Sequence, residues 1–168
     1  MLFRSVLVVV EGKALMERRS IAKLRDLVTD LQLIDGVRGL VSLFSAREPS
    51  ESGKLPPPLF PDDLPEGAAY DVLVKRVMAN EIIRGKLLSE DGTLALIVLA
   101  LDPAITQSGK LNDTVAEIRK SMAENLEGLP LDARLSGVPV MQLEIRNAVE
   151  RDRIIYNAIG FIDRKSTR

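Results

Sequence analysis

A strand–helix–strand pattern that occurs twice constrains this chain more than any other feature of its sequence. Each copy opens on a run of Val, Leu and Ile that is too short for a buried helix and reads as a strand. An amphipathic stretch with a period of about 3.6 residues follows, and a second short strand closes the copy. The expected strands and helices are residues 6–10, 20–34 and 37–44, then 93–101, 112–126 and 133–138. Two such units predict an α/β (α+β) sandwich of the ferredoxin-like, split βαβ kind.

Local signals refine these helices. Leu27 lies in the middle of the apolar stripe of the first helix, so it is expected in the core. Ser20 is expected to cap the amino end of that helix. Thr114 and Glu117 have the spacing of a capping box at the start of the second helix.

Composition excludes several classes of function. The chain has no Cys and no His, which rules out disulfides, thiol catalysis and imidazole-ligated zinc. Its 23 basic and 24 acidic residues are well mixed, so there is no electrostatic case for nucleic acid. No glycine pattern matches a phosphate or dinucleotide loop. We therefore expect no metal, no cofactor and no nucleic-acid partner. An enzyme that uses only carboxylates or Lys is the weakest hypothesis, because the usual general base at neutral pH is missing.

Residues 46–66 differ from the rest of the chain because they contain six prolines. Proline lacks an amide donor, so this segment is expected to be an irregular loop. Leu59 and Phe60 place apolar side chains in it. One interpretation is that they gate or line a hydrophobic cleft, or dock a neighbouring subunit. The other is that the loop folds over its own domain with Phe60 as a plug.

Three further elements are expected outside the repeat. A helix is predicted over residues 68–79, and a hairpin strand at residues 85–89 should precede the strand at 93–101, with Asp91 in the turn. A last helix over residues 140–162 is charged early and apolar late. Its late apolar residues, which include Ile155 and Ile159, are candidate contacts to substrate or subunit, or a surface for self-association. They are alternatively one side of an amphipathic helix packed on the domain, or the first turns of a membrane helix.

The order of these features resembles the first extracytoplasmic loop of resistance-nodulation-division (RND) exporters. The similar branch includes the hopanoid exporters and the mycobacterial large membrane proteins. The resemblance covers nearly the whole chain outside the Pro-rich loop, and it depends on the order of the motifs more than on any one of them. The matching segments are residues 6–12, 31–43, 85–92 and 135–139, followed by Glu144-Ile145 and Arg151-Asp152.

The resemblance implies a porter domain, which is the part of an RND pump outside the membrane. The proton-relay carboxylates of that family lie in membrane helices, so no catalytic residue is carried over and the chain is expected not to be an enzyme. The expected partners are a hydrophobic or lipid-like substrate, the rest of the transporter, neighbouring subunits and a second copy of the chain. The expected location is the extracytoplasmic side of the inner membrane, and both ends of the chain are interpreted as cuts beside membrane helices.

One porter-like domain is expected over residues 1–162, with a tail at 163–168. Its parts are the first βαβ unit (5–45), the Pro-rich loop (46–66), the helix and hairpin (67–92), the second unit (93–139) and the last helix (140–162). The alternative from another class is a free-standing ferredoxin-like module that binds a small ligand or assembles oligomers. The βαβ repeat alone would account for such a module, and chain ends cut beside membrane helices would not be required.

Overall fold

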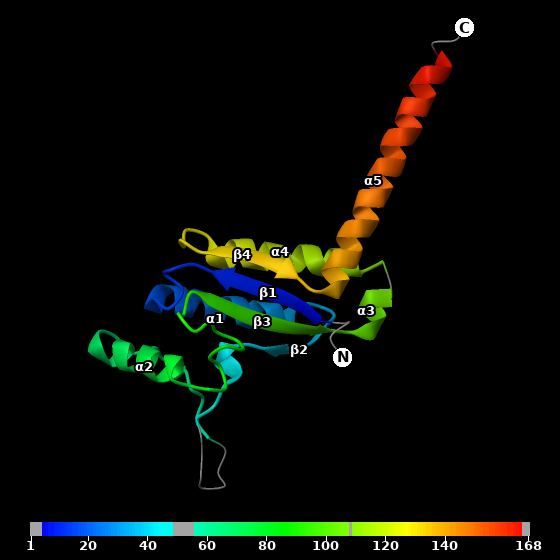
Figure 1. Ribbon diagram of the computed structural model, residues 1–168. Helices are drawn as coiled ribbons and strands as arrows, with labels where there is room; N and C mark the ends of the chain where they lie inside the picture. The colour runs from blue at the N-terminus through cyan, green and yellow to red at the C-terminus, as the bar shows by residue number, and fades with distance from the viewer. Residues whose placement is uncertain (1–4, 49–55, 108, 166–168) are drawn as a thin grey trace.

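A four-stranded antiparallel sheet forms the centre of the part of the chain that the structure describes (Figure 1). The computed structural model describes residues 5–48, 56–107 and 109–165, with side chains except at residue 107 and residues 152–165. The elements are β1 (Ser5–Glu11), α1 (Arg18–Leu33), β2 (Val37–Val41), η2 (Leu43–Ser45), α2 (Ala68–Met78), β3 (Leu94–Leu101), α3 (Pro103–Gln107), α4 (Leu111–Leu126), β4 (Asp132–Ser136) and α5 (Val138–Lys165).

The strand order confirms the expected fold class. The sheet runs β2-β3-β1-β4, and all neighbouring strands are antiparallel. Each helix of the repeat, α1 and α4, connects two strands that are not adjacent, as a split βαβ unit requires. The two copies therefore interleave, and β1 and β3 form the centre of the sheet.

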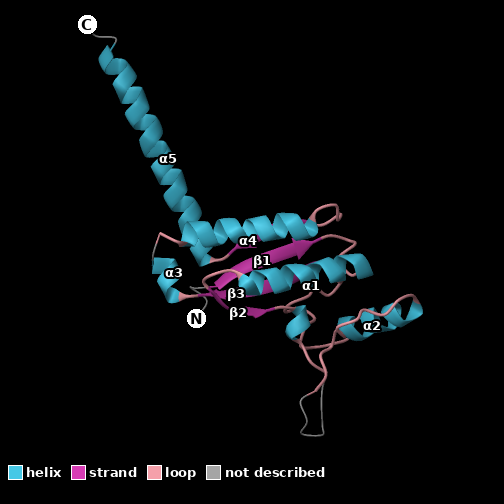
Figure 2. Ribbon diagram, turned by 180° about the vertical axis from the view of Figure 1, so that it is seen from behind, coloured by secondary structure: helices cyan, strands magenta, loops and turns pink. Residues whose placement is uncertain are grey.

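Both repeat helices cover the same face of the sheet (Figure 2). Along β1 the side chains alternate, and Val6, Val8 and Val10 are fully buried. Their partners on β3, among them Ile97 and Leu99, are buried on the same face. The α1 stripe of Ile21, Leu24, Leu27 and Leu31 packs against this face, together with Val115, Ile118 and Met122 of α4. Burial of these apolar side chains is the main term that holds the sandwich together.

The expected helix caps are wrong. α1 begins at Arg18, two residues before Ser20, with Glu17 in the cap position. Ser20 lies inside the helix, is buried, and its Oγ has no hydrogen-bond partner. α4 begins at Leu111, so Thr114 lies inside the helix and donates its amide to the carbonyl of Lys110. In both cases the helix starts earlier than the side-chain signal, because the preceding turn already supplies helical backbone bonds.

The expected hairpin forms its turn but not its first strand. Residues 85–89 make an isolated bridge, Leu88 with Ala95, because the carbonyl of Ile83 accepts several of the following amides and winds the segment into turns. The turn itself is held by Asp91. A hydrogen bond from the Ser89 hydroxyl, with further ones from the hydroxyl and amide of Thr93, lowers the pKa of Asp91 to about 2.

The strands at residues 37–44 and 133–138 are shorter than expected. β2 ends at Val41, where Ser42 caps the short helix η2. β4 ends at Ser136, where Gly137 has a φ of +110°. A Cβ at Gly137 would lie 2.4 Å from the carbonyl oxygen of Ser5, so glycine is required at this junction. α5 starts directly after it and extends away from the sandwich (Figure 1).

The packing of α1 gives a direct test of this core. Leu27 is fully buried, so Leu27→Asp places an unpaired charge between helix and sheet and should lower the free energy of unfolding by about 3–5 kcal/mol. Leu33 lies on the same helix but is 80% exposed, so Leu33→Asp should change it by less than about 0.5 kcal/mol. Urea unfolding of both variants measures the difference. Equal stability of the two variants would mean that this face of α1 is not part of the core.

Candidate functional site

The apolar residues of the Pro-rich loop lie inside the molecule. Leu59 is 1% exposed and Phe60 is 3% exposed, and both belong to the main core. The Phe60 ring meets the Phe44 ring edge-on, with centroids 5.1 Å apart. This is the plug arrangement. In it Phe60 offers no surface to a substrate or subunit, and Leu59 only reaches the floor of a hollow beside the ion pair of Glu48 and Arg76. Contact of either side chain with a ligand stays a prediction that requires the loop to open.

Two arginines of α1 fix the described part of this loop. Arg25 donates hydrogen bonds to the carbonyls of Pro61 and Asp62, and its guanidinium lies over the ring of Phe44, 5.3 Å from the centroid. Arg18 donates to the carbonyls of residues 64 and 65. These side-chain donors satisfy backbone carbonyls of the loop, while the carbonyl of Pro57 accepts the amide of Glu48. As expected, residues 46–48 and 56–66 form no helix or strand. Residues 49–55 of this segment lie outside the described residues.

The other candidate contacts, Ile155 and Ile159, lie in α5, but their side chains are outside the described residues. The described part of α5 does present apolar side chains: Met141, Ile145 and Val149 are 56%, 63% and 62% exposed. A helix would place these three on one side, because they are four residues apart.

A larger apolar surface lies on the sheet itself. The face opposite α1 and α4 carries Leu7 and Val9 of β1, Leu96 and Val98 of β3, and Val41 of β2, which together we call the open sheet face. Leu7 pairs directly with Val98, and Val9 with Leu96, so their side chains adjoin across the strands. Val41, paired with Val98, is 49% exposed and the others are half-buried. Figure 1 views this face, and no described helix covers it.

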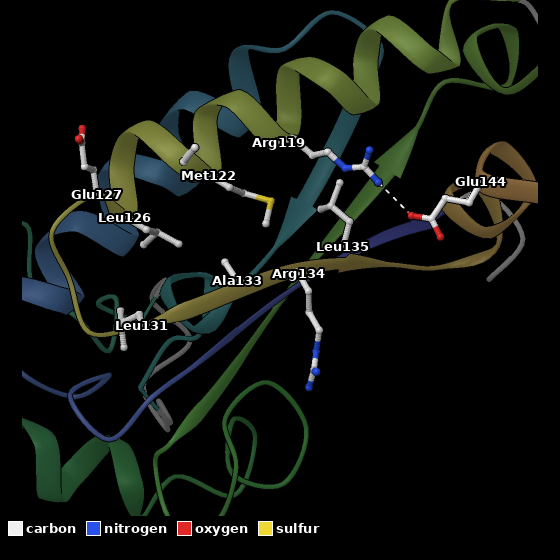
Figure 3. A pocket seen from close by; sticks show the side chains of 10 residues that line it. Arg119, Met122, Leu126, Glu127, Leu131, Ala133, Arg134, Leu135 and Glu144 are labelled. Carbon is white, nitrogen blue, oxygen red and sulfur yellow. Dashed lines mark hydrogen bonds and ion pairs between the residues drawn. The ribbon is translucent and has the colours of Figure 1, made fainter. Parts of the chain in front are cut away.

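A second concave surface lies between α4 and β4, and we call it the α4/β4 groove (Figure 3). It encloses about 520 Å³. Met122 and Leu126 of α4 point toward the strand, and Leu135 of β4 points toward the helix. At one end, Arg119 forms an ion pair of 3.0 Å with Glu144 of α5. The groove thus has an apolar floor and a charged end.

A third hollow lies between α2 and the start of α1. Tyr70 donates its hydroxyl proton to the carbonyl of Met16, at 2.9 Å. Burial raises the pKa of Tyr70 to about 12, and the charge of Arg18 only partly offsets it. A phenol held neutral and bonded to the backbone serves packing, not proton transfer. Within residues 5–48, 56–107 and 109–165, no cluster of acidic residues could hold a metal ion.

The comparison with known families decides the identity of this domain. The model of the MMPL family matches residues 3–162. The chain belongs to the MMPL family. The resemblance to RND exporters is confirmed, since MMPL proteins are members of the RND superfamily, and MMPL transporters are not enzymes. A search of curated proteins finds no match. Of the helices that the structure describes, none is both long enough and apolar enough to cross a bilayer.

Membership of the MMPL family makes this chain part of a larger transporter. It favours the exporter hypothesis over the free-standing module. Sequence reasoning missed the open sheet face, although a signal was present. β3 reads Leu-Ala-Leu-Ile-Val-Leu-Ala-Leu without a polar residue, so both of its faces are apolar.

The plug position of Phe60 leads to a second prediction. Phe60→Ala removes a buried ring next to Phe44 and should cost about 3–5 kcal/mol of stability. Phe60→Leu keeps much of the apolar volume and should cost clearly less. Thermal unfolding of the two variants measures the difference. A Phe60→Ala variant as stable as the parent chain would show that the ring is dispensable for packing.

Proposed function

We propose that this MMPL domain is an extracytoplasmic porter domain and that it takes part in the capture or passage of hydrophobic or lipid-like substrates. The observation that carries the proposal is the open sheet face. Its five side chains adjoin one another across three strands, and no described helix lies over them (Figure 1). Apolar surface of this kind is stabilised when it leaves water, by about 25 cal/mol per Å².

The chemistry of this face suits an apolar ligand and offers little to a polar one. Val9, Val41 and Val98 are β-branched, so they lose little side-chain freedom when a ligand covers them. Charged and polar groups stand at its border, where Val9 pairs with Arg134 and Leu7 with Ser136 of β4. An amphipathic molecule can therefore lay its hydrocarbon part along β1 and β3 while its polar part reaches the β4 side.

Isosteric substitutions test this proposal. The Val9→Thr, Val98→Thr double variant keeps the shape of the face but adds two hydroxyls, each of which costs about 1–3 kcal/mol when a ligand covers it without a partner. Binding of the apolar fluorophore N-phenyl-1-naphthylamine should weaken at least about fivefold.

Val72→Thr is the matched control, because Val72 is 65% exposed on α2 and away from the sheet. It should leave the affinity for the fluorophore unchanged, and thermal unfolding should show that all variants are folded. ATP and duplex DNA, titrated in parallel, should not bind. Unchanged fluorophore affinity in the double variant, or an equal loss in Val72→Thr, would contradict the proposal.

The location of the domain is tested in the whole transporter. Leu33 is 80% exposed and the chain has no Cys, so Leu33→Cys gives a single labelling site in this domain. Any cysteines elsewhere in the transporter are replaced first. A membrane-impermeant maleimide should label spheroplasts, from which the outer envelope has been removed, as fully as lysed cells. Labelling that appears only after lysis would place the domain on the cytoplasmic side.

A further inference from the structure

β4 is one of the two outer strands of the sheet, so one of its sides has no strand beside it. Gly12, at the end of β1, donates its amide to Thr93 on the β3 side. The direction of the backbone N–H and C=O groups alternates from one residue of a strand to the next. The N–H and C=O groups of Glu11 and Val9 therefore point toward β4. Their partners are Asp132 and Arg134. The backbone N–H and C=O groups of Ala133 and Leu135 therefore point outward, away from the sheet.

The free edge lies beside the α4/β4 groove (Figure 3). Ala133 and Leu135 have their side chains on the α4 side of the sheet, as have their cross-strand partners Val10 and Val8, and they line the groove with Leu131. A strand placed next to β4 would bond to the outward backbone groups and direct alternate side chains toward Met122 and Leu126 of α4. An apolar groove next to a free strand edge is the arrangement that binds extended peptide segments by strand addition.

The charges of β4 add a requirement on the residues of that strand. Asp132 lies directly opposite Glu11, and like charges in that position are unfavourable. Arg134 is paired with Glu11 at 3.0 Å. Among the described residues, Asp132 forms no ion pair. A basic residue of an added strand, placed opposite Asp132, would neutralise it.

We infer that the β4 edge is a docking site for an extended strand supplied by the rest of the transporter. The added strand runs antiparallel to β4, with apolar side chains in the α4/β4 groove and a basic residue opposite Asp132. The inference rests on the family assignment and not on the proposed substrate. It also places the partner on a different surface from the open sheet face.

Two observations favour this edge and this occupant. The opposite edge, β2, has a register irregularity between Val37 and Gly39, which interrupts regular pairing. A second copy of the chain, paired through β4, would be related by a two-fold axis normal to the sheet. Because α5 extends away on the β4 side (Figure 1), the two α5 helices would then point in opposite directions, which does not suit two domains of one membrane protein.

The β4 sequence itself supplies a probe for the test. In an antiparallel pair centred on Ala133, Asp132 faces an Arg, Arg134 faces an Asp, and Leu131 faces a Leu. A labelled nine-residue peptide, Leu-Pro-Leu-Asp-Ala-Arg-Leu-Ser-Gly, is therefore complementary to β4. We expect it to bind the 168-residue chain in fluorescence anisotropy, with the protein titrated to about 0.5 mM.

Backbone methylation tests strand addition directly. In this register the central Ala of the peptide directs its amide toward β4, whereas the Asp before it directs its amide away. N-methylation of the Ala should weaken binding at least about tenfold, and N-methylation of the Asp should change it less than about threefold. Equal effects of the two methyl groups, or no binding of the parent peptide, would overturn the inference.

A charge exchange tests the register. The Asp132→Arg, Arg134→Asp double variant should bind the parent peptide at least about tenfold more weakly, because like charges then face each other. A peptide with its Asp and Arg exchanged should restore the affinity to within about threefold. The arginine introduced at position 132 lies opposite Glu11, so the fold keeps an ion pair at this place in the sheet. Failure of the exchanged peptide to restore binding would show that the assigned register is wrong.

The Val9→Thr, Val98→Thr double variant, which changes only the open sheet face, should bind the peptide as tightly as the parent chain does. The fluorophore and the peptide thus report on two separate surfaces, and either proposal can fail while the other stands.

Discussion

One-sided burial is the physical constraint on which the rest of this structure depends. The sheet carries apolar side chains on both faces, but among the described elements the two repeat helices, α1 and α4, lie on the same face. Val8, Ile97 and Leu27 lie in the core between the helices and the sheet, and none of them has exposed surface. The second face keeps Leu7, Val9, Leu96 and Val98 half-buried with nothing described above them. Such a surface does not contribute to the stability of the domain itself. Exposed apolar patches mark sites of interaction with other molecules.

The Pro-rich loop shows how the same chain avoids a second exposed apolar surface. Leu59 and Phe60 return to the core, and the loop's carbonyls are satisfied by Arg25 and Arg18 instead of by a sheet. The buried apolar residues and the two arginines thus hold the described part of the loop in place. The apolar surface that the described elements leave uncovered is therefore the face of β1 and β3, and not the described part of this loop.

The outer strand β4 and the helix that follows it, α5, share one side of the sandwich (Figure 1). Gly137 lets the chain pass within contact of the Ser5 carbonyl and enter α5 directly. α5 closes one end of the α4/β4 groove, where Glu144 meets Arg119. The exposed positions Met141, Ile145 and Val149 continue an apolar surface along α5. Strand edge, groove and helix therefore lie together at one side of the sandwich, which is the side where we infer that a strand of the transporter docks.

The sequence by itself determined the repeat, the helical stripes and the fold class, because apolar periodicity reports directly which side of an element is buried. The absence of His and Cys and the mixed charge were also decisive, since they exclude chemistry whatever the fold. Only the tertiary structure decided where the helices begin, because turns before Arg18 and Leu111 start them earlier than Ser20 and Thr114 suggested. It also decided that Phe60 is a plug. Above all, it decided that the described helices cover only one face of β3, which is apolar throughout. A continuous apolar strand predicts burial on both sides, and nothing in its own residues tells whether the second cover comes from the same chain or from another molecule.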